Sequence, residues 1–255
     1  MRIVKLRDIS ELKTGPFGTQ FRASEYVTEG IPVINVKDIG YGSLLVSGLD
    51  HVSENTLERL SEHKLQEGDI VFGRKGSVDR HCLIRKGQDG WMQGSDCIRV
   101  RFTDAIVYPE FVSYYLLTDA VKMKINNSAV GSTMASLNTD ILGDIDIILP
   151  DCEEQKRIAL ILGTIDKKIS NNNQINDYLC AQLQILFSYL FNISVMPESW
   201  TQGVLADIAN ITMGQSPSGE SFNTQGNGYP FYQGSTDFGT IFPAKRMYTD
   251  KPSRY

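Results

Sequence analysis

The sequence contains no apolar run close to the roughly 20 residues needed to span a bilayer, and its first residues do not resemble a signal peptide. Only four cysteines and three histidines occur in the chain, and the cysteines show no C-x-x-C spacing. This scatter argues against a disulfide framework and against a zinc site. We therefore expect no membrane segment, no metal site, free thiols and a cytoplasmic location.

The chain also lacks an excess of basic residues, and its formal net charge is −5. Such a balance argues against broad, non-specific binding to nucleic acid. One stretch departs from it: residues 70–101 contain seven Lys or Arg against three Asp, a local balance of +4. This stretch is either a local basic patch or a set of ordinary solvated strand edges and turns.

Catalytic motifs are missing as well. Gly73-Arg74-Lys75-Gly76-Ser77 lacks the G-x-x-x-x-G-K-[ST] spacing of a phosphate loop. The sequence shows no Ser/His/Asp set in one context, no glycine loop for S-adenosylmethionine and no proline-aromatic loop of an amino-methyltransferase. We expect no catalytic residues and no enzyme activity in this chain by itself.

A long amphipathic helix dominates what is present. Apolar and Asn residues follow one another at spacings of 4, 3, 4, 3, 4, 3, 4, 3 and 4, which is an unbroken heptad seam. The seam consists of Ile158, Leu162, Ile165, Ile169, Asn172, Asn176, Leu179, Leu183, Leu186 and Leu190. Asp151 and Glu154 suit a capping box at its start. About 39 residues would form a rod of roughly 58 Å, which we interpret as a spacer.

The centre of this seam is polar. Asn172 and Asn176 lie within the run Asn171-Asn172-Asn173-Gln174. Polar seam residues lower the stability of a coiled coil and can fix its register and partner number. A solvated hinge or a local loop is the other interpretation. Gly163 is a second weak point, since Gly costs about 1 kcal/mol relative to Ala in a helix.

Residues 1–150 predict a mixed α+β domain. Strands are expected at 31–36, 70–72, 82–84, 97–102 and 145–149, and helices at 53–65 and 109–125. Residues 14–22 form a glycine-bracketed segment with two aromatic residues that we expect to be exposed, Phe17 and Phe21. Residues 126–134 are small and polar, which predicts a loop.

The beginning of the domain recurs after the helix. Leu6-Arg7-Asp8-Ile9, followed by Gly15, matches Leu205-Ala206-Asp207-Ile208, followed by Gly214, at an offset of 199. Ile31-Pro32-Val33-Ile34-Asn35 is echoed by Tyr229-Pro230-Phe231-Tyr232-Gln233 at an offset of 198. Such a repeat predicts a second copy of the module. The expected organisation is a first α+β domain at 1–150, a coiled-coil spacer helix at 151–194 and an incomplete start of a second copy of that domain at 195–255.

Three stretches carry a resemblance to a known family. They are Thr14-Gly15-Pro16-Phe17-Gly18 with Gly30-Ile31-Pro32-Val33-Ile34; Gly68-Asp69-Ile70-Val71-Phe72 with Arg74 and Gly76-Ser77; and Leu149-Pro150 followed by Glu153-Glu154-Gln155-Lys156-Arg157-Ile158-Ala159. Together with the order of domain, helix and second copy, they resemble the specificity subunit of type I restriction–modification systems, in a half-length or truncated form. The resemblance covers the whole chain, and the last stretch is its most specific part.

The resemblance implies a protein that reads double-stranded DNA and performs no chemistry itself. In that family two target-recognition domains each read half of a bipartite site, and two antiparallel spacer helices set the distance between the halves. Methyltransferase subunits dock on the helices and methylate adenine with S-adenosylmethionine, which this chain would not bind. Restriction subunits join the complete complex and cut unmarked DNA.

This sequence departs from the family pattern because it holds one complete domain and one spacer helix. We expect two chains to pair through residues 158–190, forming a homodimer that reads two inverted copies of one half-site. A coiled-coil adaptor without DNA contact, or an inactive truncated specificity subunit, is the alternative.

For DNA contacts the sequence favours the basic hairpin and the small-residue loops. Arg, Asn and Gln can pair with base edges, whereas Lys more often contacts phosphates. The predicted DNA-binding residues are Gln20, Arg22, Lys37, Arg74, Lys75, Ser77, Arg80, His81, Asn127, Ser132 and Thr133, with Asn126 beside them. Each of them is otherwise an ordinary turn or surface residue.

Overall fold

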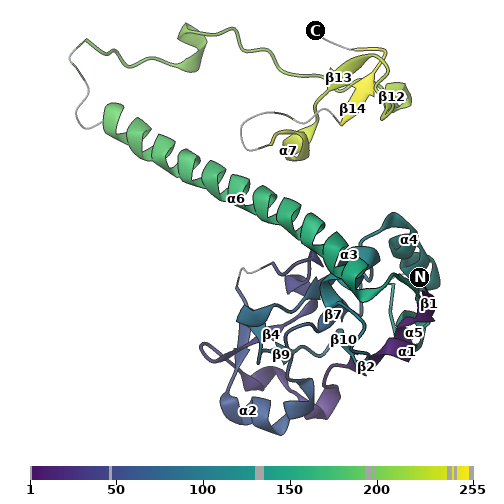
Figure 1. Ribbon diagram of the computed structural model, residues 1–255. Coiled ribbons are helices and arrows are strands. Elements are labelled where there is room, and N and C mark those ends of the chain that lie inside the picture. The colour runs from purple at the N-terminus through teal and green to yellow at the C-terminus, as the bar shows by residue number, and fades with distance from the viewer. Residues whose placement is uncertain are drawn as a thin grey trace. The chain divides into compact units, whose positions relative to one another are not determined.

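The computed structural model describes residues 2–45, 48–129, 135–192, 197, 199–239, 243 and 246–252 (Figure 1). The chain divides into two compact units, Met1–Ala181 and Gln182–Tyr255, and each is described here by itself. The first unit is of the predicted α+β class and includes most of the long helix. Among the described residues, no helix is long and apolar enough to cross a membrane.

A five-stranded sheet forms the centre of the first unit, in the order β2 (Ser10–Thr14), β10 (Cys97–Phe102), β7 (Ile70–Gly73), β8 (His81–Leu83) and β5 (Tyr41–Gly42). The first four strands are antiparallel to their neighbours, and β5 runs parallel to β8. All four residues of β7 are buried, which explains why it reads as a continuous apolar run instead of an alternating one.

A second sheet has the order β3 (Tyr26–Val27), β6 (Asp50–Val52), β4 (Ile31–Ile34) and β9 (Met92–Gln93). Helix α2 (Glu54–Arg59) follows β6 within the predicted helical range, and the Ser53 hydroxyl caps it by accepting from the Thr56 amide. Leu57, Leu60 and Leu65 are buried. The helix is shorter than expected, because the chain passes into a 3-10 turn at Ser61–His63.

The start of the chain is tied to the segment that precedes the long helix. Strand β1 (Arg2–Lys5) pairs antiparallel with β11 (Asp146–Leu149). The short helices α1 (Leu6–Ile9) and α5 (Thr139–Gly143) lie beside each other. Buried Leu6 and Ile9 join the largest core cluster, which extends from the central sheet to Ala159 on the long helix.

The predicted helix at 109–125 is two helices, α3 (Pro109–Leu116) and α4 (Asp119–Ser128). Thr118 has extended backbone angles, and its hydroxyl donates to the Tyr115 carbonyl, which closes the end of α3. The prediction of a loop from 126 onward was therefore wrong at its beginning. Asn126 and Asn127 belong to the last turn of α4, where both are exposed.

The long helix α6 spans Cys152–Leu190, 39 residues, as the heptad pattern predicts. Asp151 Oδ1 accepts from the Glu154 amide at 2.9 Å, and the Glu154 carboxylate pairs with Arg157. Its first turns pack on the domain, where Ala159 and Gln155 are buried and Ile158 contacts the core. The apolar residues farther along the helix are exposed.

The second unit contains a three-stranded sheet in the order β12 (Phe222–Asn223), β14 (Met247–Thr249) and β13 (Tyr229–Phe231), and a short helix α7 (Gly234–Asp237). Strand β14 is antiparallel to both neighbours. Further 3-10 turns of the chain lie at Gly18–Gln20, Ala23–Glu25, Val36–Asp38, Lys86–Gln88, Leu205–Asp207 and Gly219–Ser221.

Candidate nucleic-acid interface

The loop between β7 and β8, residues 74–80, is held firmly by its neighbours. The Arg74 amide donates to the Asp96 carbonyl, and the Arg74 carbonyl accepts from the Leu137 amide, both at 2.8 Å. The Gly76 amide donates to the Ala135 carbonyl at 3.0 Å. Val78, within the loop, is fully buried. The loop therefore presents its polar side chains from a fixed backbone.

Aromatic rings and cations meet around this loop. The Arg74 guanidinium lies 4.7 Å from the centroid of the Phe17 ring. The Arg80 guanidinium and the Lys122 ammonium lie 5.4 Å and 5.5 Å from the centroid of the Tyr41 ring. Both rings are largely exposed, Phe17 by 42% and Tyr41 by 50%. We call this set the hairpin surface: Phe17, Tyr41, Arg74, Lys75, Arg80 and Lys122.

The cations of this surface differ in their partners. Lys75 Nζ lies 3.0 Å from Asp96 Oδ1, so its single positive charge already has a carboxylate partner. Within the described part of the chain, Arg74 and Arg80 form no ion pair with a carboxylate, and the Nε atom of each is buried without a hydrogen-bond partner. Stacking on a ring orients a guanidinium while leaving its outer N–H groups free to donate.

The other predicted contacts are placed less centrally. Gln20 and Arg22 are exposed, but Gln20 Oε1 accepts from the Phe17 amide at 3.3 Å. Lys37 pairs with Asp50 at 2.9 Å, and this hydrogen bond raises the pKa of the Lys37 ammonium. Ser77 is exposed on the loop itself, and Asn127 is exposed on α4. Ser132 and Thr133 lie outside the described residues.

His81 does not fit the prediction. Its side chain is fully buried, Nε2 lies 3.0 Å from Ser113 Oγ, and the ring packs against Phe72. Burial lowers the pKa of His81 to about 4, so the imidazole is neutral near pH 7. His81 belongs to the core and presents no atom to a DNA surface. The same holds for Phe21, which was expected to be exposed and is 7% accessible.

Two cations of the basic stretch are structural as well. Arg99 is 2% exposed, donating to the Glu62 carbonyl at 2.8 Å and to Glu11 Oε1 at 2.9 Å. Arg101 donates to both oxygens of Asp69, at 2.8 Å and 2.6 Å. The sequence balance of +4 therefore overstates the charge available to a ligand. Conversely, Tyr41 and Lys122 were not among the predicted residues, because only the fold brings them to the loop.

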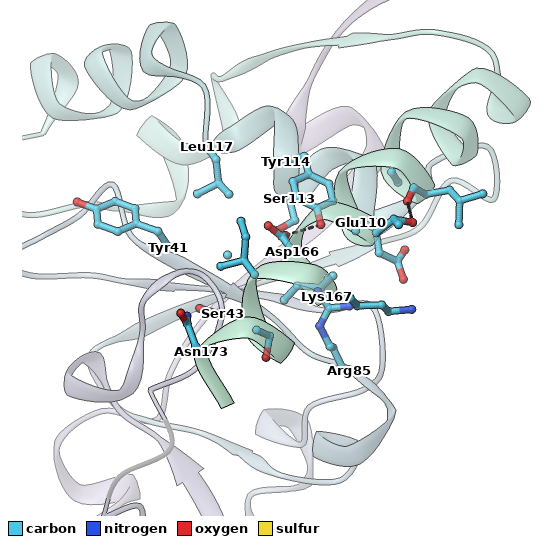
Figure 2. A pocket seen from close by; sticks show the side chains of 18 of the residues that line it. Tyr41, Ser43, Arg85, Glu110, Ser113, Tyr114, Leu117, Asp166, Lys167 and Asn173 are labelled. Carbon is cyan, nitrogen blue, oxygen red and sulfur yellow. Dashed lines mark hydrogen bonds between the residues drawn. The ribbon is translucent and has the colours of Figure 1, made fainter. Parts of the chain in front are cut away.

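A groove of about 790 Å³ runs between α3 and the first half of α6 (Figure 2). Tyr114 Oη donates to Asp166 Oδ2 at 2.6 Å across it. Burial, with the Asp166 contact, raises the pKa of Tyr114 to about 12. Arg85, Glu110 and Lys167 also line the groove, so its wall is charged as well as aromatic.

The chain is similar to proteins of one family. Residues 1–180 match the family described as the type I restriction modification DNA specificity domain. A Methanocaldococcus jannaschii protein named as a type I restriction enzyme MjaX specificity subunit is 27% identical over 249 residues, covering 88% of this chain and 57% of that protein. The HindI specificity subunit of Haemophilus influenzae is 23% identical over 198 residues, covering 73% of this chain and 43% of its own length.

Solved structures show the same fold. The type I restriction–modification S subunit from M. genitalium superposes with a TM-score of 0.53 at 16% identity, covering 99% of this chain and 63% of that one. A chain from a study of assembly and conformational transition in the type I R-M system gives a TM-score of 0.50 at 20% identity, with 99% and 66% covered. The chain spans about half the length of the relatives that it matches.

Proposed function

Because the chain belongs to the type I restriction modification DNA specificity domain family, we propose that it is the DNA-recognition component of a type I restriction–modification assembly. Its first unit reads one half-site of double-stranded DNA, and the chemistry belongs to partner subunits. A coiled-coil adaptor without DNA contact is not favoured, because the family match covers the whole first domain. Together with this role we propose a cytoplasmic location.

The hairpin surface is the observation that carries this proposal. Arg74 and Arg80 are oriented by Phe17 and Tyr41, and no described residue accepts from their outer N–H groups, which suits paired hydrogen bonds to guanine O6 and N7. Lys75, at the exposed edge of the same loop, suits a phosphate contact. Gln20, Arg22, Lys37, Ser77 and Asn127 remain outer candidates around this centre.

Selection from a random DNA library, followed by affinity measurements at several salt concentrations, tests the proposal. Arg80→Ala and Arg74→Ala are each expected to weaken specific binding by about 1–3 kcal/mol and to relax the base preference at one position. Lys75→Ala is expected to weaken all sequences alike and to reduce the salt slope by about one unit. Lys86→Ala, at the other end of β8, removes the same charge as a control. Wild-type affinity in both Arg variants would contradict this assignment.

The second unit supports the proposed repeat. Its sheet β12–β14–β13 has the strand order of β3–β6–β4 in the first unit, and both pairs within each of these three-strand sets are antiparallel. The pairing register also corresponds: Ile31–Val33 face Val52–Asp50, and Tyr229–Phe231 face Thr249–Met247.

A close backbone approach recurs at the same place. Gly30 has a φ of +153°, and a Cβ there would lie 2.3 Å from the Val52 carbonyl oxygen; Gly228 has a φ of +90°, and a Cβ there would lie 2.3 Å from the Thr249 carbonyl oxygen. Both positions require glycine for the same physical reason. We therefore assign residues 195–255 to the start of a second target-recognition module, after a domain at 1–150 and a spacer at 151–194.

Helix α6 is the proposed docking element for the partners. It exposes more apolar surface than one heptad seam contains, including Leu160, Tyr178 and Ile185, each exposed by more than 70%. Methyltransferase subunits that hold S-adenosylmethionine would cover this additional surface, and restriction subunits would join the complete assembly. The test measures the affinity of the purified methyltransferase subunit for this chain. We expect binding to the wild-type chain and loss of binding when Tyr178→Glu and Ile185→Glu are combined.

The seam itself is proposed to pair two copies of this chain. Two first units on one coiled coil would read inverted copies of a half-site, because a two-fold axis relates them. The solution mass of the chain, measured alone and with the methyltransferase subunit, tests this directly. A dimer that binds two methyltransferase subunits is expected, and a monomer at micromolar concentration would refute self-pairing.

A further inference from the structure

We propose that Asp79 reads a base of the DNA half-site by accepting a hydrogen bond from the exocyclic amino group of a cytosine or an adenine, and that Tyr41 positions its carboxylate. This inference rests on the proposed function, because it adds a contact to the hairpin surface. It assigns a preference for an amino-bearing base at one position, beside the guanine contacts of Arg74 and Arg80.

The side chain of Tyr41 contacts three charged groups. Its hydroxyl donates to Asp79 Oδ2 at 3.3 Å. The Arg80 guanidinium and the Lys122 ammonium lie 5.4 Å and 5.5 Å from the centroid of the same ring. One residue therefore orients a carboxylate through its hydroxyl and a guanidinium through its ring, at two successive positions of the loop between β7 and β8.

The backbone beneath these side chains is fixed. Tyr41 and His81 are paired residues where β5 runs parallel to β8. Asp79 and Arg80 lie between Val78 and His81, which are both fully buried. A side chain held on such a backbone can discriminate between bases, because it cannot move far to meet a wrong one.

The carboxylate of Asp79 is available to a ligand. Its side chain is half-buried, and within the described part of the chain it forms no ion pair, whereas Asp96 pairs with Lys75 at 3.0 Å. Among the described residues, no group donates to Asp79 Oδ1. A carboxylate without a cation repels the phosphates of DNA, so on this surface it weakens binding unless a base donates to it.

The chemistry of the base edges determines which bases Asp79 accepts. In the major groove cytosine N4 and adenine N6 present N–H donors, whereas guanine O6 and thymine O4 present acceptors. A carboxylate has acceptors only, so it favours the first two bases and repels the other two. The aspartate and the neighbouring Arg80 thus select opposite hydrogen-bonding patterns.

Selection from a random DNA library tests the assignment in the full chain. The wild-type chain is expected to prefer cytosine or adenine at one position by at least about tenfold, the usual effect of a hydrogen bond to a charged group. Asp79→Ala is expected to lose this preference at that position alone and to bind non-specific DNA at least as tightly, because a repulsive charge is gone. Glu58→Ala removes an exposed carboxylate from α2 and is the matched control, which should keep the preference.

Base analogues separate a direct contact from an indirect effect. Pyrimidin-2-one replaces a selected cytosine, or purine replaces a selected adenine, and each analogue lacks only the amino group. The lost base-pair hydrogen bond affects both proteins alike, so the difference between them measures the contact with Asp79. The affinity of the wild-type chain is expected to fall about tenfold more than that of Asp79→Ala, and equal losses would overturn the inference.

Variants that keep the side-chain shape test the two roles separately. Asp79→Asn adds a donor and is expected to admit guanine or thymine at this position. Tyr41→Phe keeps the ring and removes the hydroxyl, so the preference at the Asp79 position should weaken while the guanine preference of Arg80 stays. A merely structural Tyr41 would lower the affinity for all sequences alike. An unchanged preference in Tyr41→Phe would overturn its positioning role.

The same binding data distinguish failure of this inference from failure of the proposed function. Sequence-specific DNA binding that depends on Arg74 and Arg80, with an unchanged base preference in Asp79→Ala, would overturn the inference and leave the function standing. Absence of sequence-specific binding by the wild-type chain would overturn the proposed function and this inference with it.

Discussion

Gln155 is the side chain that attaches the spacer helix to the first domain. It is fully buried one turn into α6. Its Oε1 accepts from the Tyr108 amide at 2.9 Å, while Nε2 donates to the carbonyls of Ile106 and Pro150 at 3.2 Å and 3.0 Å. A single side chain thus satisfies three backbone groups from two different segments.

Gln155→Ala removes all three hydrogen bonds and leaves three backbone groups to find water or remain unsatisfied. A net contribution near 1 kcal/mol per bond, with a larger cost for a group left buried, gives an expected destabilisation of about 3 kcal/mol. Gln155→Glu keeps the acceptor but turns a carboxylate oxygen toward two carbonyls, and we expect it to destabilise at least as much.

Urea unfolding followed by the fluorescence of Trp91 measures this change in the first unit, in a Trp200→Phe background that removes the other tryptophan of the chain. Gln174→Ala, at an exposed position of the same helix, is the matched control and should lie within about 0.5 kcal/mol of wild type. A loss of less than about 1 kcal/mol in Gln155→Ala would refute the reasoning that these bonds hold the helix on the domain.

Three further predictions concern single positions. Gly163→Ala is expected to stabilise α6 by up to about 1 kcal/mol, because its Cβ would make an ordinary contact at 3.5 Å from Tyr114 Oη; a lower Tm would contradict this. His81 is held neutral with a pKa of about 4, below the ordinary 6.5, so the unfolded chain binds the extra proton and stability falls by up to about 3 kcal/mol as pH drops from 6.5 to 4. His81→Gln should flatten this part of the stability–pH curve, and an unchanged slope would count against it. Arg101→Ala leaves the buried Asp69 carboxylate without its guanidinium and should cost about 3 kcal/mol, with no change in the salt slope of DNA binding.

Features with a local signal were predicted correctly from the sequence. Asp151 marked the start of α6, and the heptad seam ends where the helix ends, at Leu190. The break between α3 and α4 was missed because no Gly or Pro marks it; the end of α3 depends on a Thr118 hydroxyl that the sequence cannot place. A side-chain hydrogen bond to the backbone can end a helix without changing the spacing of its apolar residues.

The candidate interface was also predicted only in part from the sequence. Arg74 and Arg80 could be proposed because they lie in one short loop between two strands. Tyr41 and Lys122, far away in the sequence, join them only because β5 pairs with β8 and the ring of Tyr41 reaches both cations. Arg99 and Arg101 look equally basic in the sequence, but they pair with Glu11 and Asp69 of the same domain. Alternation along β10 does not reveal which groups each face meets.

Contacts with the first domain do not account for the stability of the spacer helix. Of its 39 residues only Gln155 and Ala159 are buried in the described chain, and a helix of this length depends on packing more than on propensity. Beyond the first turns, six apolar side chains of the seam are exposed by 51% to 66%. The burial that stabilises this part of α6 therefore has to come from outside the first domain.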